Sequence, residues 1–162
     1  MGITKGKIRE LSLRIVDELK KLPPVDVSLT AAEAAELAQL MIVMNKDGAV
    51  ADESSNRAAK IFFDAGLQVA NEAGLVGAKP VNMSEMDEII LKRGLPDRSV
   101  SVNAVDLSSL AAELIQSVHV GPGSSDHIAS AVRKVIEIGD GMTKSVTRRV
   151  IMSLPEFSQL LN

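Results

Sequence analysis

The 162-residue sequence contains no cysteine, no tryptophan and no tyrosine, and aromatic residues make up only 2% of it. Without cysteine there can be no disulfide bond, no thiolate nucleophile and no cysteine metal ligand. With only three phenylalanines, the chain has almost no rings to stack on exposed bases, so binding of single-stranded nucleic acid is not expected. The hydrophobic core must be built from Leu, Ile, Val, Ala and Met.

Length and charge set further bounds. A chain of this length is expected to form one domain, residues 1–162, and to bury roughly 70% of its unfolded surface. The formal net charge of -3 gives no global electrostatic case for nucleic acid, although it permits a local basic face. No apolar run approaches the roughly 20 residues of a membrane span, and the charged start "MGITKGKIRE" shows no secretory signal. We therefore expect a cytoplasmic protein without a membrane partner.

The spacing of apolar residues predicts an all-α fold, a single-domain bundle of about seven helices. Thr30 and Glu33 form a capping-box pattern at a helix start, and Gly74 and Gly94 are expected to end helices. The segment "LPDRSVSVNAV" alternates as a strand would, but no partner strand is visible, so we predict an extended loop there. The expected helices cover approximately residues 4–22, 30–44, 52–73, 84–93, 107–120, 125–138 and 143–154.

The first helix is separated from the rest by Pro23-Pro24, and "PPVDV" is the one credible linker. Residues 1–24 could therefore form an N-terminal helical arm that packs on a neighbouring subunit. The alternative is that this helix packs on its own domain, which is how compact domains usually form. In either case its contact face is the apolar stripe formed by Ile8, Leu11, Ile15 and Leu19.

The stretch "MNKDGAVADES" resembles the calcium-binding loop of EF-hand proteins. With Gly48 at the sixth position of such a loop, Asn45 and Asp47 supply oxygens at the third and fifth. The first position falls on Val43, and Glu53 comes one place before the position that needs a bidentate glutamate. Calcium takes about six to eight oxygens, so we expect a plain helix-to-helix turn. Asn45, Asp47 and Glu53 are its weak metal candidates, and calcium binding is not expected.

A second turn is predicted at Asp140-Gly141, inside "VIEIGDGMTKSVTRRVIMSL". Two helices joined there would resemble the helix-turn-helix of bacterial DNA-binding regulators, near residues 128–154. The fit is flawed, because Asp140 falls where the turn needs glycine. A helix–Asp-Gly–helix unit would then occur twice, at Asp47-Gly48 and at Asp140-Gly141. Common turn chemistry explains this as well as duplication does. The basic residues that could contact phosphates are Lys144, Arg148, Arg149, Arg133 and Lys134.

No pattern in the sequence supports catalysis. The only histidines, His119 and His127, are separated by a Pro-Gly break, and nothing places them together with a carboxylate as a zinc site requires. Ser125, Asp126 and His127 are adjacent, so they cannot point at one another as a Ser-His-Asp triad must. The segment "GPGSS" is not followed by the lysine of a phosphate loop. We expect no enzyme, no cofactor and no metal site.

These observations favour a non-enzymatic protein-interaction or assembly module, a subunit of a homo-oligomer or of a larger complex. The expectation rests on the apolar helices around residues 40–44 and 62–69, on the separable first helix and on the lack of convergent polar chemistry. The alternative is a DNA-binding regulator that uses the helix-turn-helix. A third reading is a sensor that holds a small apolar ligand between its helices, which would require a cavity.

Overall fold

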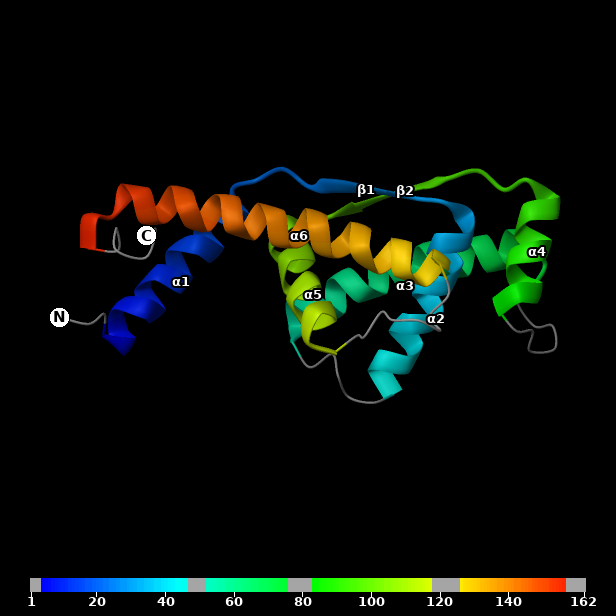
Figure 1. Cartoon of the computed structure of the whole chain (residues 1–162), viewed down its shortest axis with the longest axis horizontal. Helices are drawn as coiled ribbons and strands as arrows, with labels where there is room; N and C mark the ends of the chain where they lie inside the picture. The colour runs from blue at the N-terminus through cyan, green and yellow to red at the C-terminus, as the bar shows by residue number, and fades with distance from the viewer. Residues whose placement is uncertain (1–3, 47–51, 76–82, 118–125, 157–162) are drawn as a thin grey trace.

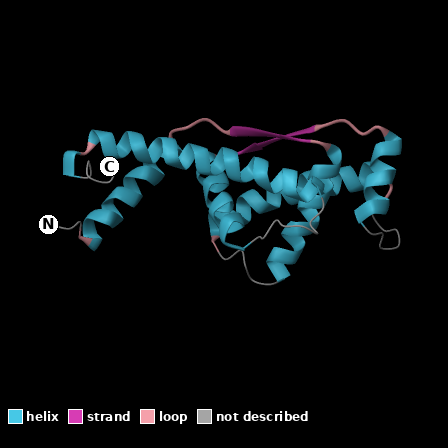
Figure 2. Cartoon of the chain, in the orientation of Figure 1, coloured by secondary structure: helices cyan, strands magenta, loops and turns pink. Residues whose placement is uncertain are grey.

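The computed structural model describes residues 4–46, 52–75, 83–117 and 126–156 (Figure 1, Figure 2). In these residues the chain forms six helices and two short strands, so the predicted all-α class is confirmed. No helix in the described part is long and apolar enough to cross a membrane. The elements in chain order are α1 (Lys5–Lys20), β1 (Val25–Leu29), α2 (Ala31–Lys46), α3 (Glu53–Glu72), α4 (Met83–Arg93), β2 (Arg98–Val102), α5 (Ala104–Ser117) and α6 (Asp126–Ser153).

The segment predicted as an extended loop contains a β-strand, and its partner lies in the segment read as a linker. β1 and β2 pair in antiparallel orientation, with Val27 opposite Val100 and Ser28 opposite Ser99. In both strands the third and fifth side chains are buried and the second and fourth are exposed. Figure 1 shows this two-stranded ribbon along one side of the helical body. So short a pair is stable because its apolar face packs on helices.

The chain consists of two units with the same order of elements, α1–β1–α2–α3 and α4–β2–α5–α6. In the first, β1, α2 and α3 begin at residues 25, 31 and 53, and in the second β2, α5 and α6 begin at residues 98, 104 and 126, a constant offset of 73. The ends of α1 and α4, at residues 20 and 93, differ by the same number. In the sequence, Leu-Pro at 22–23 recurs at 95–96, and Val-Ser at 27–28 recurs at 100–101. The fold is therefore an internal duplication.

The helix crossings of the two units correspond in detail. In the first unit, a Cβ added to Gly66 of α3 would lie 2.3 Å from the Cβ of Ala38 and 2.4 Å from the carbonyl oxygen of Ala34. In the second unit, a Cβ on Gly139 of α6 would lie 2.6 Å from the Cβ of Ala111. Gly139 follows Gly66 by the same offset of 73 residues. Each crossing is close enough that only glycine fits.

The predicted helix-turn-helix near residues 128–154 is wrong, because α6 is one continuous helix of 28 residues. Asp140-Gly141 lies within this helix and makes no turn. The helix–Asp-Gly–helix unit considered in the sequence analysis therefore does not recur here. The hydroxyl of Thr143 donates to the carbonyl oxygen of Gly139 at 2.9 Å, inside the helix. Buried Val135 and Val146 hold the segment on both sides. Tertiary packing therefore overrides the weak helix propensity of the two glycines.

The two units differ in the length of their last helix. α3 stops at residue 72, where Gly74 follows with a φ of +74°. α6 continues to residue 153, eight residues beyond the corresponding position 145. This extension carries Val146, Val150 and Ile151, which pack on Leu11 and Leu19 of α1. Figure 1 shows α1 lying along this end of α6.

Candidate functional site

Four small polar side chains project from the outer face of the β1–β2 ribbon. Asp26 lies opposite Ser101 and Ser28 lies opposite Ser99, and all four residues are exposed. The residues between them, such as Val27, are buried in the main hydrophobic core. The ribbon therefore holds a fixed, approximately two-fold arrangement of hydrogen-bonding groups above a helical base.

The size of this ribbon matches a known mode of recognition. Two five-residue strands make a ribbon roughly 17 Å long, with about 5 Å between the strands. The major groove of B-DNA, about 12 Å wide, admits a two-stranded ribbon. Side chains on the outer face of a ribbon placed there face the base edges. Serine hydroxyls donate and accept hydrogen bonds, and the aspartate carboxylate accepts them.

Basic residues lead into both ends of the ribbon. α1 ends with Lys20, followed by Lys21, and α4 ends with Lys92 and Arg93; all four are exposed. Because the strands are antiparallel, α1 and α4 lead into opposite ends of the ribbon, as Figure 1 shows. Within the described residues, neither Lys20 nor Lys92 takes part in an ion pair. Two positively charged flanks thus lie on either side of a polar ribbon.

The five basic residues predicted to contact phosphates are only partly brought together. Arg133, Lys144 and Arg148 are exposed and lie at helical spacing on one face of α6. Lys134 instead donates to Oε1 of Glu33 at 2.7 Å, and Arg149 lies 3.7 Å from a carboxylate oxygen of Glu18. Lys144 is paired along the helix with Asp140 at 2.9 Å.

The predicted interface stripe on α1 packs on its own chain. Leu11 and Leu19 are buried against α6, Ile15 is partly buried there, and Ile8 is 51% exposed. In this structure α6 of the same chain extends far enough to cover Leu11 and Leu19. α1 contacts both α5 and α6 of its own chain.

The weak calcium candidates fall at the edge of the described residues. Asp47 lies outside them, as does the side chain of Asn45. Glu53 is the first residue of α3, and its exposed carboxylate pairs with Arg57 at 3.3 Å. His119 also lies outside the described part of the chain.

Two ion pairs join the units. Their carboxylates, Glu33 and Asp106, occupy corresponding positions. Glu33 accepts hydrogen bonds from Lys134 at 2.7 Å and from the N–H of Thr30 at 2.8 Å. Burial raises the pKa of Glu33, but these donors and the Ser130 hydroxyl outweigh it and lower the pKa to about 2. Asp106 accepts two bonds from Arg57, at 3.0 and 3.2 Å. This contact raises the pKa of Arg57.

A polar cluster that sequence reasoning missed lies at the start of α6. Glu36 of α2, Asp87 of α4 and His127 of α6 each place one potential ligand atom within 4.8 Å of the other two. Nε2 of His127 is 3.7 Å from Oδ2 of Asp87. The three residues are separated by 51 and 40 positions in the chain, so no local spacing could reveal them. The one available signal was a glutamate among the buried positions of α2.

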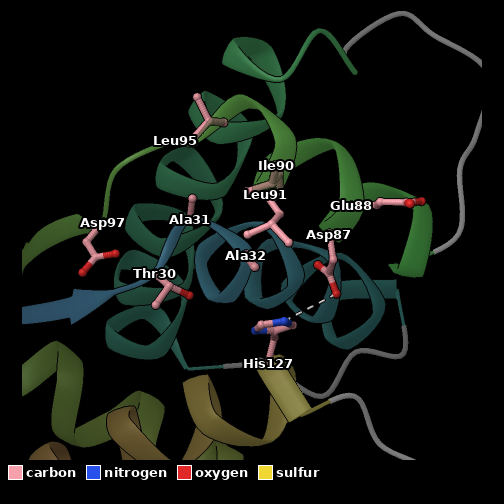
Figure 3. A pocket seen from close by; sticks show the side chains of 11 residues that line it. Thr30, Ala31, Ala32, Asp87, Glu88, Ile90, Leu91, Leu95, Asp97 and His127 are labelled. Atoms are coloured by element: carbon pink, nitrogen blue, oxygen red, sulfur yellow. Dashed lines mark ion pairs between the residues drawn. The ribbon is translucent and has the colours of Figure 1, made fainter.

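Asp87 and His127 also line a cleft of about 360 Å³ between α4 and the start of α2 (Figure 3). Figure 3 shows the two side chains facing each other across one end of the cleft, with Ala32 close by. The remaining wall is largely apolar and includes Ile90, Leu91 and Leu95. The cleft thus combines an apolar wall with convergent polar groups.

Comparison with known proteins adds no family: no family model, no curated protein and no solved structure matches the chain.

Proposed function

We propose that the protein is a non-enzymatic regulator that binds duplex DNA through the outer face of the β1–β2 ribbon. One observation carries the proposal: two paired strands, anchored by buried side chains, present Asp26, Ser28, Ser99 and Ser101 outward in fixed register. A two-stranded ribbon fits the major groove, where each base pair presents a distinct pattern of donors and acceptors. Asp26 would accept from the amino group of cytosine, and the serines would accept from or donate to several bases.

The flanking basic residues would supply affinity rather than sequence preference. Lys20 and Lys92 lie close to opposite ends of the ribbon, where phosphate backbones border the groove. Their local position matters more than the net charge of -3, because phosphate contacts act over about a Debye length of 10 Å. The proposal therefore replaces the helix-turn-helix route with one through the ribbon.

The first test is fluorescence anisotropy with a labelled pool of random-sequence duplexes, titrated at several salt concentrations. Binding should weaken steeply with salt, and the double variant Lys20→Ala, Lys92→Ala should reduce the slope by about two charges. Lys5→Ala is the matched control, because Lys5 is exposed at the far end of α1. Equal slopes for all three proteins would contradict a role for the flanks.

A second pair of variants tests the ribbon itself. Ser28→Glu and Ser99→Glu each place a carboxylate on its outer face without touching the core, so both should abolish binding by charge repulsion. Ser12→Glu makes the same change on an exposed face of α1 and should leave binding almost unaltered. If the ribbon variants bind as tightly as Ser12→Glu does, the ribbon does not contact the DNA.

Self-association is the second candidate, favoured by exposed apolar residues at the α1–α6 end. Ile8 and Leu13 of α1 are 51% and 57% exposed, and Met152 of α6 is 67% exposed. A two-helix cluster with apolar residues on its outside can extend its core by pairing with a second copy. Light scattering behind a sizing column should then give a dimer at low and at high salt, and Leu13→Lys should give a monomer. Leu67→Lys, at an exposed leucine of α3, is the control.

A further inference from the structure

Glu36, Asp87 and His127 combine the donor types that zinc-like ions prefer, one imidazole nitrogen and two carboxylate oxygens. They come from three different helices, so an ion held between them would tie α2, α4 and α6 together. We infer that these three side chains bind one divalent transition-metal ion of the Zn²⁺ class, and that the ion keeps an open position toward the adjoining cleft.

The spacing of the donor atoms suits such an ion. Metal–ligand bonds of about 2.0–2.2 Å in a tetrahedral site place the ligand atoms about 3.3–3.6 Å apart. Nε2 of His127 and Oδ2 of Asp87 are 3.7 Å apart, and the carboxylate of Glu36 supplies an atom within 4.8 Å of both.

The burial of these groups also favours a cation. Glu36 is completely buried, and Oδ1 of Asp87 is a buried atom that accepts no hydrogen bond within the described residues. Two carboxylates held this close repel each other. A divalent ion offsets both charges at once. His127, whose side chain is 45% exposed, leaves an entry route from solvent.

The constant offset of 73 residues between the two units provides an internal comparison. Seventy-three positions away from Glu36, Asp87 and His127 are Ser109, Arg14 and Ser54, which cannot form the same ligand set. The corresponding place in the fold therefore does not need two carboxylates and an imidazole for packing. The cluster, which combines residues of both units, therefore occurs at only one of the two corresponding places in the described fold.

A cleft of about 360 Å³ adjoins the cluster, because Asp87 and His127 also line that cleft, and the open metal position would face into it (Figure 3).

The test is a titration of the metal-free full chain with ZnCl₂ by isothermal calorimetry, with the shift in thermal unfolding as a second readout. One equivalent should bind and raise the midpoint. Asp87→Asn and His127→Asn should each weaken binding by at least about tenfold, since even an indirect supporting residue contributes that much. Glu88→Gln is the matched control: it removes a carboxylate from the next residue, which also lines the cleft, and should leave the affinity unchanged.

Nuclear magnetic resonance of the unaltered protein keeps the proposal testable if the variants fold poorly. The chain has only two histidines, so His119→Asn assigns the imidazole signals. Added Co²⁺ should shift the His127 signals strongly at one equivalent. Absence of saturable Zn²⁺ binding, equal affinities for Glu88→Gln and His127→Asn, or unshifted His127 signals would each overturn the proposal.

Discussion

Glu33 and Lys134, which are 101 residues apart in the chain, place Oε1 and Nζ 2.7 Å from each other where α2 meets α6. Glu33 also completes the capping box of α2, so one carboxylate both starts a helix and joins the two units. The pair formed by Arg57 and Asp106 joins α3 to α5 in the corresponding manner. Two carboxylates at equivalent positions, Glu33 and Asp106, thus each form a polar contact with the other unit.

The depressed pKa of Glu33 predicts a loss of stability in acid. Its folded-state pKa is about 2 against an ordinary value of 4.5. The stabilisation is therefore complete above about pH 4.5 and is lost as pH falls toward 2; at neutral pH it amounts to about 3 kcal/mol at most. Urea unfolding of the native protein and of Glu33→Gln should differ most near pH 7 and converge only at about pH 2 and below. Glu53→Gln, at an exposed carboxylate, should behave as the native protein does.

Replacement of glycine by alanine should have opposite effects at the helix crossings and at Gly141. Gly66→Ala and Gly139→Ala push a methyl group against Ala38 or Ala111 and should each cost about 1–3 kcal/mol in the free energy of unfolding. At Gly141, nothing lies within 4 Å of an added Cβ, so Gly141→Ala should stabilise α6 by about 0.5–1 kcal/mol. Denaturant unfolding measures all three. A destabilised Gly141→Ala would contradict the continuous helix.

Arg57 makes two ion pairs that contribute unequally to the stability of the fold. Its contact with Asp106, whose side chain is 9% exposed, leaves a buried carboxylate when Arg57 is replaced. Its contact with Glu53 lies in solvent, where water and salt screen the attraction, so it contributes little to stability. Arg57→Ala should therefore lower the free energy of unfolding measurably, and Glu53→Ala should leave it almost unchanged. A double-mutant cycle between Arg57 and Asp106 should show coupling, and additive single effects would contradict it.

The packing of α1 on α6 predicts a graded response to truncation. Leu19→Ala removes a buried side chain from the small core shared with Val150 and should cost about 2–5 kcal/mol. Leu13→Ala, on the exposed face of the same helix, should change stability by less than about 0.5 kcal/mol. Hydrogen exchange of the α1 amides should accelerate only in the first variant. Fast exchange of α1 in the native protein would mean that the helix does not rest on α6.

Features encoded within a few residues were predictable from the sequence. Thr30 and Glu33 exchange hydrogen bonds of 2.8 and 3.1 Å as the capping box requires. Gly74 and Gly94, which follow α3 and α4, adopt positive φ. These signals act locally, so the pattern alone is sufficient. The start of α5 was less accurate: the helix begins at Ala104, three residues before the predicted 107, where Oδ1 of Asn103 accepts the backbone N–H of Val105 at 2.9 Å.

Features that depend on distant partners were not predictable in this way. β2 is a strand because β1 lies 73 residues earlier, and neither segment indicates its partner. The continuity of α6 depends on the buried side chains of Val135 and Val146. The cluster of Glu36, Asp87 and His127 exists only once three helices have met. In each case tertiary contacts set the outcome, and short-range spacing does not report them.

Because both strands of the ribbon belong to one chain, each is presented to the other at an effective concentration that dilution does not change. A ribbon assembled from two separate chains would come apart at low protein concentration, whereas this one forms whenever the chain folds. The covalent link also allows the halves to diverge: position 26 is aspartate and its counterpart, position 99, is serine. The two ends of the ribbon therefore differ chemically, so a molecule lying along it meets a surface with a defined direction.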